Sequence, residues 1–369
     1  MAVNGFGIVR ENGLGQYGDR KKDEIGLLPV PADLEREFLE MIRGGRLSGV
    51  RSVRLDLVED WIDQGRSAEL ICRSLSAFNR LVIQIVLNVH AEIYPWLRKT
   101  TFLEFGSGGR DEQTLGSDQD NGLLMDDTLS VPEEELDDAT HDIVVALDGA
   151  GIMLCSGNVM ISNPVWRGHF ALWQRRMVNW LGNPHEKGPW QSGLILDFKP
   201  IYGAHKPAFQ LRESMWSYVR AHPVALRMMV DELTDYSLPL SFFGLFVTER
   251  TGRWAGHINI KTSVLAHMTN CARILCLKHD ISCRNTCDRL RALRLAGHVG
   301  TELGDSLLVG WEWLQSKRLR IGLHRLRNGL FPHEWVLPST LSRQEKTIFR
   351  SVIQSVEQFV RLVQAGAGL

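Results

Sequence analysis

The chain has 369 residues, of which 44% are hydrophobic and 23% charged, as in an ordinary soluble globular protein and unlike a disordered or disulfide-scaffold chain. Its 42 basic and 43 acidic residues give a net charge of −1, so the chain as a whole has no bulk attraction for polyanions. The length predicts two domains and an extension. We expect a leader with short helices over residues 1–65, a first domain over residues 66–204 and a helical domain over residues 205–369.

The N-terminal region predicts a loose leader followed by a short helix. Residues 1–30 are rich in glycine and charge, and they lack the apolar segment of a signal peptide, which favours a cytoplasmic protein. Leu34, Phe38 and Ile42 recur at helical spacing ahead of Gly44, so we expect an amphipathic helix that ends there.

A second, longer helix is predicted over residues 67–89. Its most apolar run, residues 81–89, contains Gln84 and Asn88 and is much shorter than the roughly 20 apolar residues of a membrane-spanning helix. We therefore interpret it as a core helix and expect no membrane partner.

Two predicted strands enclose a glycine-rich turn. Residues 101–105 form a strand-like stretch that runs into Gly106, and residues 123–125 form a second one. From Asp111 to Asp148 there are 13 acidic residues and no Lys or Arg. Part of this excess lies in residues 133–138, where carboxylates suit the positive end of a helix, and we assign these side chains to solvent.

The next stretch predicts a helix and a buried strand. Asn163 and Pro164 predict the start of a helix that ends at Gly182 and carries an aromatic stripe, which is typical of core packing. Residues 193–198 predict a buried strand with Asp197 at its end. A buried carboxylate is costly without a partner or a metal ion, which makes Asp197 a candidate site residue.

From about residue 205 onward the pattern is helical, and residues 250–350 hold 17 basic against 7 acidic residues. Two features of this basic half have a functional alternative. A cysteine and histidine cluster could bind zinc, but it lacks a Cys-x-x-Cys pair, so buried reduced thiols are favoured. A basic stretch beside two tryptophans could bind RNA, but a solvated helix face is the simpler interpretation. The residues concerned are Cys271, Cys276, His279, Cys283 and Cys287 for zinc, and Lys317, Arg318, Arg320, Arg325 and Arg327 with Trp311 and Trp313 for RNA.

The most informative segment is residues 106–120, GSGGRDEQTLGSDQD. Glycine at positions 106, 108 and 109 allows close backbone approach, so amide groups and the Ser107 hydroxyl could hold phosphate oxygens. Asp118 and Asp120 stand two apart on a predicted strand and so point the same way, offering hard oxygen ligands to Mg²⁺. With Asp197 they could form a three-carboxylate site for an in-line displacement at phosphorus.

These residues resemble the nucleotidyltransferase signature of the DNA polymerase β superfamily. More closely, residues 106–115 and 118–121 resemble bacterial nucleotidyltransferases related to protein-PII uridylyltransferase, which often carry cyclic-nucleotide-binding and CBS domains. The resemblance covers roughly residues 66–365. It continues through residues 155–160, 163–166, 196–203 and 256–261.

The resemblance implies an α+β fold, with a polymerase-β-like core of a short mixed sheet and helices joined to a C-terminal α-helical domain. It implies that Asp118, Asp120 and Asp197 bind Mg²⁺ or Mn²⁺, with Asp197 as a ligand or as the base for the acceptor hydroxyl. It assigns phosphate binding to the turn and charge neutralisation to two cations. These residues are Gly106, Ser107, Gly108 and Gly109 in the turn, with Arg110 and Lys199 as the cations.

The expected reaction is transfer of a nucleoside monophosphate from an NTP, either UTP or ATP, to an acceptor hydroxyl, with release of pyrophosphate. By resemblance the acceptor is a protein, which implies a role in signal transduction. Two alternatives remain open. One is a catalytically silent nucleotide sensor or scaffold, against which the three carboxylates argue. The other is an RNA or small-molecule nucleotidyltransferase.

Overall fold

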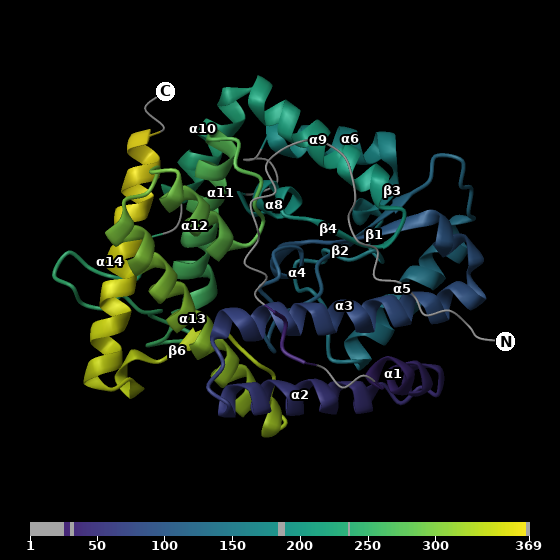
Figure 1. Ribbon diagram of the computed structural model, residues 1–369, viewed down its shortest axis with the longest axis horizontal. Coiled ribbons are helices and arrows are strands. Elements are labelled where there is room, and N and C mark those ends of the chain that lie inside the picture. Colours follow the sequence, from purple (N-terminus) through teal and green to yellow (C-terminus); the bar gives the residue numbers. More distant parts are fainter. Residues whose placement is uncertain (1–25, 30–32, 184–188, 235–236, 367–369) are drawn as a thin grey trace.

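The computed structural model describes residues 26–29, 33–183, 189–234 and 237–366. Most of the loose leader expected over residues 1–30 lies outside these residues. The fold is α+β, as predicted, with a small mixed sheet flanked by helices and a helical C-terminal half (Figure 1).

Three helices precede the sheet: α1 (Leu34–Arg43), α2 (Leu47–Asp63) and α3 (Ala68–Ile93). The predicted short helix is confirmed, since α1 buries Leu34, Phe38 and Ile42 and ends at Gly44. Helix α3 begins where the Ser67 side chain accepts a hydrogen bond from the Leu70 amide. By length and composition α3 could cross a membrane, but 67% of its most apolar window is buried inside the protein, as in a core helix.

The sheet has four strands in the order β3-β2-β1-β4. Strand β1 pairs antiparallel with both β2 and β4, whereas β2 pairs parallel with β3. The short helix α4 (Gly106–Gly109) follows β1 directly and forms the glycine turn. The strands are β1 (Thr100–Glu104), β2 (Asn121–Met125), β3 (Arg167–His169) and β4 (Lys199–Gly203).

Two predicted elements between β2 and β4 were wrong. The helix expected from Asn163 starts later, because a 3-10 turn (Pro164–Trp166) and β3 come first and Gly168 has a φ of +148°, outside the helical region. Helix α6 (Phe170–Gly182) then buries Trp173, Met177 and Trp180 as the aromatic stripe predicted.

The strand expected over residues 193–198 is instead the end of α8 (Pro189–Leu196), and β4 begins three residues later. A short apolar run fits a buried helix as well as a buried strand. Asp197 therefore lies in the connection ahead of β4 and not at the end of a strand.

Helix α5 (Glu133–Gly149) has the acidic residues 133–138 at its start, in agreement with their predicted place at the positive end of a helix. Its acidic first turns are not wholly left to solvent, because Glu133 and Asp137 both form ion pairs with the buried Arg167. This salt-bridged arginine fixes the start of α5 to the edge strand β3.

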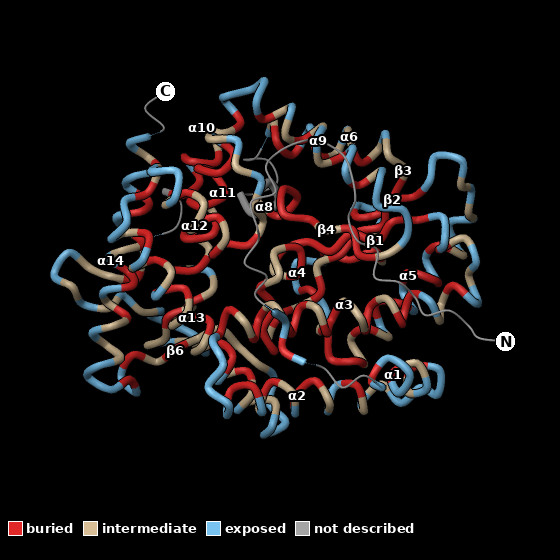
Figure 2. The backbone as a smooth tube through the Cα atoms, viewed as in Figure 1, coloured by how far each residue is buried: buried red, intermediate tan, exposed pale blue. Residues whose placement is uncertain are grey.

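Helices α9 (His205–Ala221) and α10 (Pro223–Asp231) lead into the C-terminal half, and α9 packs against α6 and β4. The rest is built from α11 (Ala266–Lys278), α12 (Thr286–Leu295), α13 (Thr301–Arg327) and α14 (Arg343–Gly366), with a two-stranded sheet of β5 (Ile258–Asn259) and β6 (Trp335–Val336). Figure 2 shows buried backbone running from the small sheet into these helices, and the buried apolar side chains form one continuous cluster.

Hydrogen bonds also tie the two halves together. The Glu312 carboxylate on α13 accepts from the Ala68 and Glu69 amides at the start of α3. The side chain of Glu69 in turn pairs with Arg291 on α12. As a result, the helical half is held firmly against the end of α3.

Candidate functional site

A cleft of about 380 Å³ lies between the glycine turn and the helical half. This volume falls in the range of small-molecule sites. One wall carries Gly106, Ser107, Asp118 and Asp120, and the opposite wall carries side chains from residues 259–273 and from α13. The cleft is thus built jointly by segments that are far apart in the chain.

The glycines of the turn are required by close packing. Gly106 has a φ of +56°, in the left-handed region, and a Cβ at this position would overlap the Asp120 carboxylate. A Cβ on Gly108 would overlap Glu104, and one on Gly109 would overlap the carbonyl oxygen of Asp197. Of the predicted phosphate-binding residues in the turn, the structure therefore places Gly106 and Ser107 at the cleft and uses Gly108 and Gly109 to bring β1 and the β4 connection together.

The two aspartates are positioned by the residues that alternate with them. Gln119 is buried, and its side-chain Nε2 donates to the backbone carbonyls of Val144 and Ile152, at 3.1 Å each. Asn121 accepts from the Ile161 amide at 2.8 Å. Since alternate residues of an extended chain point to opposite sides, anchoring Gln119 and Asn121 in the core directs Asp118 and Asp120 to the cleft.

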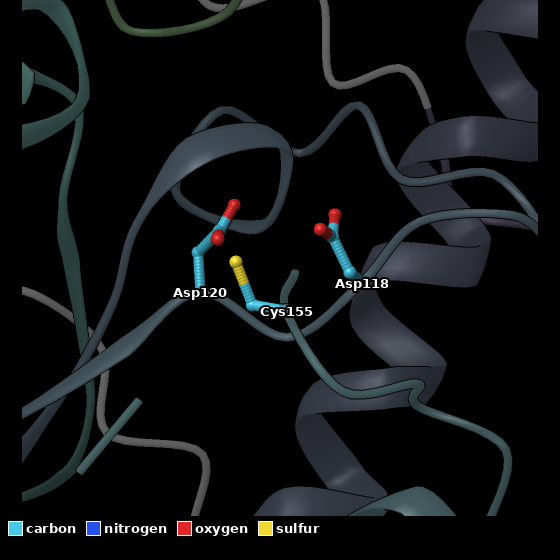
Figure 3. Close-up of side chains that lie close together, drawn as sticks. All are labelled: Asp118, Asp120 and Cys155. Carbon is cyan, nitrogen blue, oxygen red and sulfur yellow. The ribbon is translucent and has the colours of Figure 1, made fainter. Parts of the chain in front are cut away.

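Asp118 and Asp120 converge on one point, with the Cys155 thiol between them (Figure 3). A carboxylate oxygen from each aspartate and the Cys155 sulfur all lie within 4.8 Å of one another. Lys261, from the opposite wall, places its Nζ 3.6 Å from Asp118 Oδ1. The predicted pairing of Asp118 with Asp120 at one site is therefore present in the structure.

Asp120 is poorly compensated inside the protein. Its Oδ1 atom is buried and has no hydrogen-bond partner among the described residues. Burial, and then the neighbouring charge of Asp118, raise the pKa of Asp120 to about 7. Burial and the two aspartates also raise the pKa of the Cys155 thiol, so this group stays protonated and donates a hydrogen bond to Asp120.

The donor set fits a hard divalent cation. Carboxylate oxygens suit Mg²⁺ or Mn²⁺, and Mg²⁺ is commonly held by one or two carboxylates together with substrate phosphates. An orphaned buried carboxylate oxygen beside a second carboxylate is the arrangement that such a cation would satisfy. The protonated thiol of Cys155 is a poor ligand by comparison.

Asp197 lies elsewhere, in a cluster of arginines. It is fully buried, and its oxygens are 2.5 Å from both Arg273 and Arg289 and 3.4 Å from Arg110. Burial alone would raise the pKa of this carboxyl, but the three arginines hold it well below its usual range. The structure thus brings together two of the three predicted carboxylates and ties the third to cations of the chain.

The two predicted cations also separate. Arg110 lines the cleft and is held by Glu112 at 2.8 Å and by Asp197. Lys199 instead places its Nζ 3.3 Å from both carboxylate oxygens of Asp111, and it is not among the cleft-lining residues.

The opposite wall holds residues for which the sequence pattern predicted no role at this site. They include Lys261, Asn270, Arg273, Trp311 and Gln315. Lys261 had a signal, since it ends the resembling segment 256–261. The others stand on α11 and α13, where helical periodicity marks them only as members of a packed face.

The zinc and RNA alternatives gain no support from these positions. Cys271, Cys276 and Cys287 are buried, and burial raises the pKa of each thiol. Among the described residues, these cysteines are not part of the converging group of metal-ligating atoms.

In the basic stretch three cations are ion-paired within the chain. Lys317 pairs with Glu345, Arg318 with Glu334, and Arg327 with Asp56 and Glu59. The tryptophan beside them at position 311 is only 1% exposed. This surface therefore offers less charge and less stacking area than its sequence indicates.

Two family models match the chain. Residues 54–187 match the model described as "Putative nucleotidyltransferase DUF294", which takes in the glycine turn and both aspartates. Residues 223–366 match the model described as "Putative nucleotidyltransferase substrate binding domain", which takes in the opposite wall of the cleft. No curated protein matches the chain.

Proposed function

We propose that the chain moves a nucleoside monophosphate from an NTP to an acceptor hydroxyl in this cleft, because residues 54–187 and 223–366 match the models of two nucleotidyltransferase domains. The observation that carries the proposal is the convergence of Asp118 and Asp120 beside Gly106, with a buried Asp120 oxygen that has no partner among the described residues. A silent scaffold has no need of such an uncompensated pair.

Asp118 and Asp120 would hold Mg²⁺ or Mn²⁺, which supplies charge neutralisation for the triphosphate and for the leaving pyrophosphate. The chain adds three cations that line the cleft, namely Arg110, Lys261 and Arg273. These side chains can bind non-bridging phosphate oxygens and orient the α-phosphate for attack.

The reaction follows from this placement. The acceptor oxygen attacks the α-phosphorus, the bond from that phosphorus to the oxygen bridging to the β-phosphate breaks, and pyrophosphate leaves. The acceptor proton is lost to solvent. In this scheme Asp197 is a positioning residue, since it holds Arg110 and Arg273 at the cleft through its ion pairs.

We propose a protein hydroxyl as the acceptor. Support comes from the resemblance of residues 106–121 to the enzymes related to protein-PII uridylyltransferase. The match of residues 223–366 to a substrate binding domain supports binding of the substrate by the helical half.

Label transfer tests the proposal. The chain is incubated with host lysate, Mg²⁺ and each α-labelled NTP, beside an Asp118→Ala/Asp120→Ala variant and a control, Glu134→Ala/Asp138→Ala, which removes two exposed carboxylates of α5. Label in protein, seen with wild type and control but not with the Asp118/Asp120 variant, is the expected result. Label confined to RNA or small molecules overturns the protein acceptor, and absence of label with all NTPs overturns nucleotidyl transfer.

A further inference from the structure

One face of α13 lines the wall of the cleft opposite the aspartates. Trp311, Gln315 and Arg318 follow one another at intervals of four and three residues and all line the cleft. This spacing places their side chains on the same side of a helix. The face is therefore a continuous surface that a bound nucleotide would meet.

Trp311 carries an unused hydrogen-bond donor on this face. Its side chain is 1% exposed, and its indole Nε1 is buried with no partner among the described residues. Buried indole N–H groups are normally paired, because an unpaired buried donor is costly. A ligand acceptor in the cleft would supply the missing partner.

Gln315 offers further donors because its oxygen is already occupied. The Gln315 Oε1 atom accepts from Arg318 Nη1 at 2.6 Å, and Arg318 is itself held by both carboxylate oxygens of Glu334, at 2.5 and 2.7 Å. This arrangement fixes which end of the amide is nitrogen. The Gln315 nitrogen makes no hydrogen bond within the described part of the chain, so its N–H groups remain for a ligand.

Two more amides of the same wall repeat this pattern. The Asn270 oxygen accepts from Arg273, and the Asn259 oxygen accepts from the Lys261 and Thr262 amides at 3.1 Å each. In both residues the side-chain oxygen accepts within the chain, and the side-chain nitrogen has no hydrogen-bond partner among the residues that the structure describes.

The acceptors that line the cleft near this wall are also occupied. Both Glu334 oxygens accept from Arg318, and the two Glu112 oxygens accept from the Thr286 amide and from Arg110. The wall therefore presents hydrogen-bond donors and few free acceptors.

We propose that the α13 face binds the nucleobase of the NTP and reads its carbonyl oxygens, so that bases with a ring carbonyl, above all uracil and guanine, bind more tightly than adenine. Adenine has no carbonyl oxygen, and its exocyclic amino group would meet the donors of this wall. A site that pairs its donors with a substrate carbonyl rejects an analogue that lacks it, since the donors are then left unpaired. The inference rests on the proposed function.

The test measures equilibrium binding of UTP, GTP and ATP, as analogues with a non-cleavable α–β bridge, and of inorganic tripolyphosphate, all with Mg²⁺ and the full chain. Trp311→Phe removes the indole N–H and keeps an aromatic ring, and Gln315→Met removes the amide donors at similar size. Trp313→Phe is the matched control, since Trp313 also lies on α13 but stacks on Phe349 outside the cleft. The melting temperature of each variant establishes that it is folded.

We expect the UTP or GTP analogue to bind about tenfold more tightly than the ATP analogue. Trp311→Phe and Gln315→Met should each weaken binding of that preferred analogue about tenfold, as for one lost hydrogen bond. Tripolyphosphate binding should change by less than about twofold, and Trp313→Phe should resemble wild type.

Three results overturn the inference alone. They are equal affinity for ATP, unchanged affinity in both α13 variants, or an equal loss of tripolyphosphate binding, which would assign the donors to phosphate. If neither the NTP analogues nor tripolyphosphate binds to the wild type, the proposed function itself fails.

Discussion

Two carboxylate groups, the half-buried one of Asp120 and the fully buried one of Asp197, lie close to the same glycine turn and have opposite environments. A Cβ on Gly106 would overlap the first, and one on Gly109 would overlap the backbone of the second. Asp197 is surrounded by three arginines of the chain, whereas Asp120 has a like charge, Asp118, as its neighbour and a buried oxygen without a partner among the described residues. The arginines of the chain supply the counter-charge of Asp197, whereas under the proposed function a divalent cation supplies that of Asp120.

The pKa shifts of the two groups follow this difference. Burial raises the pKa of Asp120 to about 7, with Asp118 adding to the effect. For Asp197 the arginines outweigh the effect of burial and hold the pKa well below its usual range. Asp197 thus has an environment that favours its charged form, and Asp120 has one that disfavours it, which is the difference that the proposed cation site requires.

Removing both Asp118 and Asp120 should give the largest effect on activity. We expect Asp118→Ala/Asp120→Ala to lower nucleotidyl transfer by at least about 10³-fold, because the residues that would hold the metal ion are lost. The melting temperature should not fall, since the change relieves a repulsion between like charges. Rates of label transfer and thermal unfolding curves measure the two quantities. A variant within tenfold of wild-type activity would contradict the assignment.

Removing the charge of Asp197 from its cluster of arginines should give the largest effect on stability. Asp197→Asn leaves Arg110, Arg273 and Arg289 without their counter-charge, so we expect a loss of about 3–5 kcal/mol in the free energy of unfolding. Denaturant titration measures it, with exposed Asp138→Asn as the control.

The pH dependence of this loss has a defined sign. Because the native pKa of Asp197 is depressed, its contribution to stability is complete above the pKa of the unfolded carboxyl and is lost only as the pH falls toward the native value. The difference between wild type and Asp197→Asn should thus be constant between about pH 6 and 8. A difference that disappears within this range would show that the ion pairs do not hold Asp197.

A divalent cation should stabilise the protein specifically through the site formed by Asp118 and Asp120. At a Mg²⁺ concentration about 100 times its Kd, linkage predicts a gain of about 2.7 kcal/mol. We expect the melting temperature of wild type to rise with Mg²⁺ and that of the Asp118/Asp120 variant to stay constant. Ca²⁺ and K⁺ at matched ionic strength separate specific binding from screening. Equal responses of the two proteins would place the cation elsewhere.

The smallest effect concerns the two lysines. Lys261 lines the cleft and approaches Asp118, whereas Lys199 is engaged with Asp111. We expect Lys261→Met to raise the KM for NTP about five- to tenfold, through loss of one charge-assisted contact, and Lys199→Met to change it by less than about twofold. Steady-state kinetics distinguish the two, and the reverse order would return Lys199 to the phosphate site.

The half of the candidate site that carries the glycine turn and the two aspartates could be predicted because its residues are contiguous. A strand, a glycine turn and Asp-x-Asp within residues 101–120 have requirements that are local, such as left-handed φ at Gly106 and alternation at Asp118 and Asp120. The different fate of Asp197 is not local. The ion pairs of Asp197 depend on Arg273 and Arg289, which lie 76 and 92 residues away in the sequence. The residues next to Asp197 in the sequence do not indicate these partners.

The opposite wall was missed for a related reason. Trp311 and Gln315 fit the apolar and mixed faces of an ordinary helix, and only the docking of α13 onto the cleft brings their N–H groups, which have no partner among the described residues, to the proposed binding site. Similarly, the three-residue edge strand β3 is too short for an alternating pattern to show it. Sequence patterns thus predicted the features that depend on neighbouring residues. They did not predict the features that depend on tertiary contacts.

Glu312 has a consequence for the order in which the chain can fold during synthesis. The amides of Ala68 and Glu69, near the beginning of the chain, have their acceptor on a residue that the ribosome adds some 240 positions later. Although N-terminal domains generally fold first, the start of α3 reaches its final hydrogen bonding only after α13 has emerged. We expect a chain that stops before residue 312 to leave this helix start open, so a nascent chain of that length should remain more sensitive to proteases there than the full-length protein.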